Sequence, residues 1–123
     1  MKSMITKIAR QKLVEARLGT RTLAKVAGIA IGDGAAPGGT LTELTGTETG
    51  LKNELVRKPY ETAEKTSDTS ARYRVTLGTS EQAGKQINEI ALYDTEGDIL
   101  AIRVFENKIK DADMEMIFEM EDQ

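Results

Sequence analysis

Apolar and polar residues recur with two different periods along the chain, and each period predicts a different kind of element. Over residues 3–18, apolar side chains recur at three- and four-residue spacing, which predicts a helix, and Gly19 follows as the left-handed residue that ends it. Lys12 falls inside the apolar stripe, where its stem is expected to lie along apolar neighbours while its ammonium reaches water. The helix is expected to pack on a sheet through Ile5, Ile8, Ala9, Leu13 and Ala16.

The remaining pattern is mostly that of strands. Residues 23–31 are apolar or small at nearly every position, which is typical of a strand covered on both faces in the middle of a sheet. Alternation predicts half-buried strands over 71–77 and 114–121, and an edge strand or extended loop over 60–66. Leucines between residues 41 and 57 suggest a second, short helix. The expected fold class is therefore α+β, with the N-terminal helix packed on a mainly antiparallel β-sheet.

Two further β-prone runs, 87–93 and 99–105, flank the acidic segment DTEG and predict a hairpin with Gly97 in the left-handed conformation. Glycine at the fourth place of the acidic series does not fit a calcium loop, so these acids are expected to face water. The other candidate loop, residues 32–40, has Pro37 where a dinucleotide fingerprint needs glycine, and it is expected to be a flexible strand exit.

Composition narrows the possible functions. A chain of 123 residues is expected to form one domain over residues 1–123, and the absence of cysteine and histidine removes the usual thiolate, imidazole and zinc chemistry. No signal peptide or membrane-spanning segment is expected. Residues 1–30 hold seven Lys and Arg against one Glu, whereas residues 111–123 hold six acids and no base. This division argues against nucleic acid as a partner and makes the two ends electrostatically complementary.

Glu89 is an acid at a position expected to be buried. Under strict alternation it shares a face with apolar neighbours, where a carboxylate needs a cation or backbone donors. We expect a structural ion pair with Arg57, Lys58 or a base of the first helix.

Four segments in this order resemble the N-terminal domain of the phage tail-collar fibre family: MITKIARQKL, KVAGIAIGDGAAPG, TGLKNELVRKPY and INEIALYDTEGDILAI. The resemblance implies a structural, non-enzymatic module of a phage or prophage virion tail, with tail or baseplate proteins as partners. It implies no catalytic residue, cofactor, metal or membrane contact, and a possible homotrimer in a full fibre, assembled in the bacterial host cytoplasm. The positions that match the family pattern and are expected to be structural are Gly32, Asp33, Gly34, Glu54, Glu89 and Gly97.

Two departures and two alternatives accompany this interpretation. Ile31 stands where relatives often carry an aromatic residue, and the chain stops at Gln123 without shaft repeats, as a fragment or a stand-alone collar-like piece would. The first alternative function is a protein-interaction or regulatory adaptor. The second is a small divalent-metal-dependent hydrolase that uses Asp33, Asp94, Glu96 and Asp98.

Overall fold

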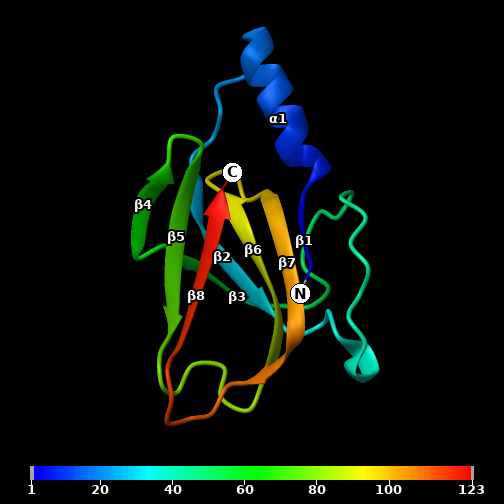
Figure 1. The fold of residues 1–123 in the computed structure, drawn as a ribbon, viewed down its shortest axis with the longest axis vertical. Helices are drawn as coiled ribbons and strands as arrows, with labels where there is room; N and C mark the ends of the chain where they lie inside the picture. The colour runs from blue at the N-terminus through cyan, green and yellow to red at the C-terminus, as the bar shows by residue number, and fades with distance from the viewer. Residues whose placement is uncertain (1, 123) are drawn as a thin grey trace.

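The computed structural model describes residues 2–122, which form eight strands, one α-helix and one short 3-10 helix (Figure 1). The elements are β1 Lys2–Ile5, α1 Lys7–Leu18, β2 Val26–Gly32, η1 Pro37–Gly39, β3 Glu54–Pro59, β4 Thr62–Ser67, β5 Ser70–Leu77, β6 Gln86–Asp94, β7 Ile99–Ile109 and β8 Met116–Asp122.

Two antiparallel sheets pack face to face. The larger has the strand order β1-β7-β6-β2-β3, and the smaller has the order β4-β5-β8. Strand β5 contacts β2, and β8 contacts β6, so the smaller sheet covers the middle of the larger one. Aliphatic and aromatic side chains from both sheets fill the space between them: Ile29, Ile31, Val75, Leu77, Ile87, Ile90, Leu92, Phe105, Phe118 and Met120.

The opposite face of the larger sheet is covered by the long connection between β2 and β3, residues 33–53. Ala30 of β2 pairs with Ala91 of β6, and these small side chains let the connection approach the sheet. Leu44 and Leu51 of the connection pack on this second cluster. Both faces of β2 are therefore buried, which confirms the expected interior strand over 23–31, although the strand begins later, at Val26.

The predicted α+β class is wrong, because the described residues are mostly strand and contain one α-helix. The segment expected to be a second short helix, 41–57, is irregular up to residue 53 and then enters β3. Two of its leucines cover the sheet instead of lining a helix, and Gly46 has a φ of 90° that interrupts regular structure.

Helix α1 is also placed differently from the prediction. Residues 2–5 form β1 at the edge of the larger sheet, and Thr6 caps a helix that begins at Lys7. Figure 1 shows α1 extending beyond the end of both sheets. Its one buried residue is Lys12, whereas Leu13 is 41% exposed, so the expected packing of an apolar stripe on the sheet is wrong. The helix is twelve residues long, and no helix among residues 2–122 is long and apolar enough to cross a membrane.

Other predictions from the sequence are confirmed. Gly19 ends α1 with a φ of 84°, and Gly97 takes a φ of 89° in the turn between β6 and β7. The segments predicted as strands over 60–66, 71–77 and 114–121 correspond to β4, β5 and β8. In β8 the side chains of Phe118 and Met120 are buried, as their alternation predicted.

Candidate functional site

Three carboxylates converge at the β6–β7 turn, in a geometry that resembles a metal site. One oxygen from each of Asp94, Glu96 and Asp98 lies within 4.8 Å of the others. The space between them is occupied by the ammonium of Lys12, whose Nζ lies 2.5 Å from Asp94 Oδ2, 2.8 Å from Glu96 Oε1 and 2.7 Å from Asp98 Oδ2. The cation held by this cluster is therefore a side chain of α1.

Burial and hydrogen bonding act in opposite directions on Lys12. Its side chain is 2% exposed, and this burial by itself lowers the pKa of the ammonium. The hydrogen bonds to Asp94, Asp98 and Glu96 outweigh that effect and raise the pKa above its ordinary value. Lys12 is thus a cation at neutral pH, and it ties α1 to the β6–β7 turn. We name these four residues the lysine cluster.

The lysine cluster corrects two predictions. Lys12 was expected to reach water, and the acids of the turn were expected to face it, but Lys12 and Asp94 are both buried. Glu96 and Asp98 do face water in part, since their side chains are 47% and 46% exposed. Asp94 Oδ1 also accepts hydrogen bonds from the backbone N–H groups of Glu96 and Asp98, each at 3.0 Å, and so shapes the turn. The available signal was a lysine inside an apolar stripe together with three acids at alternate positions of a hairpin.

Glu89 forms the centre of a second polar group, beneath the connection 33–53. It is 1% exposed and accepts three hydrogen bonds from backbone N–H groups: those of Gly34 and Asn53 at 2.9 Å and that of Lys52 at 2.8 Å. The predicted pairing with Arg57, Lys58 or a helix base is wrong, because no ion pair within residues 2–122 involves Glu89. Glu89 instead joins the two ends of the connection to the sheet.

Asn88 extends this group, although sequence reasoning did not single it out. Its Oδ1 accepts from the Ala35 N–H at 2.9 Å, and its Nδ2 donates to the Asp33 carbonyl at 3.1 Å and to Asn107 Oδ1 at 2.9 Å. Neighbouring residues in a strand normally face opposite sides, but the β6–β7 register shifts between Ile87 and Glu89. We name Asn88 and Glu89, with the backbone groups they hold, the connection clasp.

Gly32 and Gly34 lie where the connection clasp leaves no room for a side chain. A Cβ on Gly32 would be 2.5 Å from the Asn53 carbonyl oxygen and 2.6 Å from Glu89 Oε2. A Cβ on Gly34 would be 2.7 Å from the Asn53 backbone nitrogen. Asp33, between them, accepts a 2.6 Å hydrogen bond from Asn53 Nδ2. Four of the six residues predicted to be structural are thus brought together at the clasp.

The other two, Glu54 and Gly97, are linked through Arg57. The guanidinium of Arg57 donates to Glu54 Oε2 and to the Gly97 carbonyl, both at 2.8 Å, and lies over the ring of Tyr93. These contacts join strand β3 to the β6–β7 turn. Asp33 lies in the connection clasp, so the structure does not unite all four acids of the hydrolase alternative.

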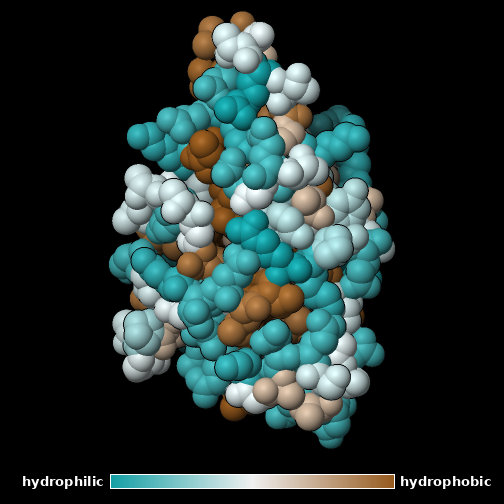
Figure 2. All heavy atoms as spheres, turned by 180° about the vertical axis from the view of Figure 1, so that it is seen from behind, coloured by the Kyte–Doolittle hydropathy of each residue, from teal (hydrophilic) through white to brown (hydrophobic). Residues whose placement is uncertain are grey.

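Two surface features remain after the polar groups are accounted for. A groove of about 830 Å³ runs between α1, β1, β7 and β8, and Arg103 crosses it to donate to the Glu119 carbonyl at 3.2 Å. The second feature is the outer side of α1, where Val14 is 55% and Leu18 72% exposed. Figure 2 shows hydrophobic atoms at the tip of the molecule, where α1 ends.

The side chains of both polar groups bind atoms of the same chain. The acids of the lysine cluster bind a lysine of the same chain, and Glu89 binds backbone N–H groups. Each group fixes a segment that has little regular pairing with a sheet: α1 in one case and the connection in the other. Their arrangement serves mechanical attachment of these segments.

Comparison with known proteins identifies one family. A family model described as phage tail-collar fibre protein, N-terminal, matches residues 1–119. Neither a search of curated proteins nor a search of solved structures finds a match.

Proposed function

Because the chain belongs to the phage tail-collar fibre protein family, we propose that it is a non-enzymatic attachment module that joins a tail fibre to the tail or baseplate. Membership of the family makes it a structural tail-fibre protein of the virion tail. The proposal adds the attachment role, tail or baseplate proteins as partners, and assembly in the bacterial host cytoplasm. It also includes a single domain over residues 1–123, present as three copies in a full fibre.

The observation that best supports a mechanical role is that the buried polar side chains of Lys12 and Glu89 bind other groups of the same chain. Lys12 is enclosed by three carboxylates of the β6–β7 turn, and Glu89 by three backbone donors of the connection. Buried groups that are fully paired stabilise one conformation, because breaking a pair leaves an uncompensated buried group. An anchor that transmits force needs this kind of rigidity.

The same observation weighs against the metal-dependent hydrolase. The carboxylates that would bind a metal already share the Lys12 ammonium, and a divalent ion would have to displace it. Titration with Ca²⁺, Mg²⁺ and Mn²⁺ tests this alternative through the backbone amide shifts of residues 94–98. Saturable shifts confined to this turn would support the hydrolase and contradict our proposal of a non-enzymatic module.

The attachment role itself is tested with tail particles that lack their fibres. Purified chain is added to such particles from a phage or prophage that carries this gene, and saturable co-sedimentation is expected. Heat-unfolded chain at the same concentration is the control for nonspecific adsorption. Absence of saturable binding by the folded chain at tens of micromolar would contradict attachment through these residues and favour the regulatory adaptor.

A further inference from the structure

The outer side of α1 carries three bases and two aliphatic residues in one stripe. At about 100° per residue, these five side chains fall within an arc of roughly 100°, and Lys12 lies on the opposite side of the helix. All five are exposed, and none of the three bases has an ion pair within residues 2–122. We name this set the basic stripe: Lys7, Arg10, Val14, Arg17 and Leu18.

A segment of matching composition lies between the end of β7 and the start of β8. It presents three acids between two isoleucines, and Ile109 and Ile117 are 55% and 59% exposed. The acids are exposed as well, and no ion pair within residues 2–122 involves them. We name this set the acidic segment: Ile109, Asp111, Asp113, Glu115 and Ile117.

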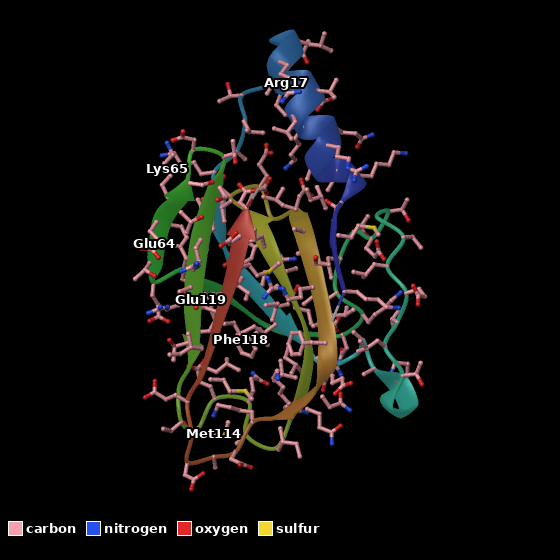
Figure 3. The ribbon with its side chains drawn as sticks, in the orientation of Figure 1. Arg17, Glu64, Lys65, Met114, Phe118 and Glu119 are labelled. Atoms are coloured by element: carbon pink, nitrogen blue, oxygen red, sulfur yellow. The ribbon has the colours of Figure 1, made fainter. Side chains whose placement is uncertain are left out.

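The two surfaces cannot meet within one molecule, because they lie at opposite ends of it. Figure 3 shows Arg17 near one end of the longest axis and Met114, within the acidic segment, near the other. Each copy therefore presents an unpaired cationic surface at one end and an unpaired anionic surface at the other. Each also exposes two aliphatic side chains at each end, which water disfavours.

We propose that the basic stripe of one copy binds the acidic segment of a second copy. Three bases face three acids, and two aliphatic side chains face two isoleucines, so charge and apolar area are matched within one contact. Opposite charges at the ends steer the encounter over about a Debye length, roughly 10 Å at 0.1 M salt. Association is accordingly salt-sensitive, and the buried aliphatic residues slow dissociation.

The symmetry of the contact follows from the fact that it joins two different surfaces. Two different surfaces of the same chain meet, so the contact is heterologous and either closes into a ring or continues as an open chain. A ring of three matches the copy number in our proposed function, but the contact is inferred from the two surfaces alone. A monomeric result would overturn the contact and leave attachment to fibreless tails as a separate question.

Sedimentation velocity and light scattering of the purified chain over a range of concentration and salt test the contact. Reversible association that weakens as salt rises is expected. The variants Arg17→Glu and Asp113→Lys are each expected to weaken it about tenfold, since one attraction becomes a repulsion. The matched controls are Lys65→Glu and Glu64→Lys on β4, away from both ends in Figure 3, and these are expected to associate like the parent.

A mixing experiment tests the pairing of the two surfaces directly. Arg17→Glu and Asp113→Lys chains each associate weakly alone, but in the mixture every contact between unlike chains is complementary. Association is therefore expected to recover in part, because a closed ring of three keeps one contact between like chains. Leu18→Ala, at a side chain already 72% exposed, is expected to weaken association without lowering the melting temperature. A parent chain that stays monomeric at millimolar concentration, reversals that behave like their controls, or a mixture that shows no recovery would each overturn the proposal.

Discussion

Two buried side chains of opposite charge, Lys12 and Glu89, find their partners in different parts of the fold: Lys12 in the β6–β7 turn and Glu89 in the connection 33–53. Lys12 is surrounded by carboxylates, and Glu89 receives backbone N–H groups. The first arrangement holds helix α1, and the second holds a connection whose only regular element is the short 3-10 helix η1. Removing the Lys12 side chain leaves the buried Asp94 without its cation, and removing the Glu89 side chain leaves three backbone N–H groups without their acceptor, so single substitutions at these two positions test the structure directly.

Glu89→Gln is expected to lower the free energy of unfolding by about 2–4 kcal/mol, because the amide nitrogen faces backbone donors that the carboxylate oxygens accept from. Urea denaturation at neutral pH measures the change. Glu61→Gln, at an exposed position, is the matched control and is expected to stay within about 0.5 kcal/mol of the parent. Equal stability of Glu89→Gln and the parent would mean that this side chain does not hold the connection.

Lys12→Met is expected to cost about 3–5 kcal/mol, because within residues 2–122 it leaves Asp98 and the buried Asp94 without an ion-pair partner and leaves Glu96 with Arg21 alone. Calcium is expected to restore part of this loss, since one oxygen of each acid lies within 4.8 Å of the others and the Lys12 ammonium no longer occupies the space between them. Lys7→Met, on the exposed side of α1, is the control and should change stability by less than about 0.5 kcal/mol. Thermal melting with and without calcium measures both effects, and a Lys12→Met chain as stable as the parent would contradict the buried role of Lys12.

At the scale of elements, strand β6 holds both segments that lie outside the sheets, the connection 33–53 and helix α1. Asn88 and Glu89, near its start, hold the connection, and Asp94, at its end, holds α1. The strand also lies in the middle of the larger sheet, between β7 and β2. Residues 86–94 therefore couple the sheet, the connection and the helix, and disturbing the clasp should free the connection before it affects the sheets.

Gly34→Ala tests this coupling, because its Cβ would lie 2.7 Å from the Asn53 nitrogen and force the connection away from the sheet. We expect a loss of about 1–3 kcal/mol in unfolding free energy and faster hydrogen exchange at the amides of Lys52 and Asn53. Gly50→Ala is the matched control, since a Cβ there meets nothing within 4 Å. Unchanged exchange in Gly34→Ala would show that the connection does not depend on this close approach.

Periodicity predicted six of the eight strands, because alternation reports directly which side of a sheet a residue occupies. It missed β1 and β3, which overlap segments expected to be helical. It failed for α1 and for residues 41–57. In α1 the apolar residues do have helical spacing, but the helix extends beyond the sheets, so the side chain of Leu13 is partly exposed. In 41–57 the leucines pack on the sheet from an irregular chain. The position of α1 depends on the β6–β7 turn, and that of the connection depends on the Glu89 carboxylate. Both partners are distant in the sequence, so the spacing of apolar residues within each segment does not reveal them.

At the scale of the whole molecule, two exposed charged surfaces lie at opposite ends of the longest axis. The basic stripe lies at one end and the acidic segment at the other. Within residues 2–122, three ion pairs belong to the lysine cluster and three join β5 to its neighbours β4 and β8. The division of charge in the sequence is reproduced in space only in part, because Glu119, Glu121 and Asp122 of β8 line the groove next to α1. A net charge of -3 conceals it, because the charges of the two ends largely cancel.

Stability of the whole molecule is expected to fall in acid, and two surface carboxylates contribute a measurable share. The hydrogen bond from Lys58 and that from the Gly78 N–H lower the pKa of Glu81. Burial raises the pKa of Glu48, but hydrogen bonds from backbone N–H groups, including those of Thr45 and Gly46, outweigh it, so its pKa is also lowered. A carboxyl whose pKa is lower in the folded state stabilises the fold above its unfolded pKa, and loses that contribution as pH falls through the folded value.

The double variant Glu48→Gln/Glu81→Gln should therefore be less stable than the parent at pH 7, and the gap should narrow as the pH falls below the ordinary glutamate pKa of about 4.5. Urea denaturation at a series of pH values from 7 down to 3 measures both curves. The control Glu64→Gln, at an exposed position on β4, should run parallel to the parent. A double variant whose curve also stays parallel to that of the parent would show that neither carboxyl is stabilised in the folded state.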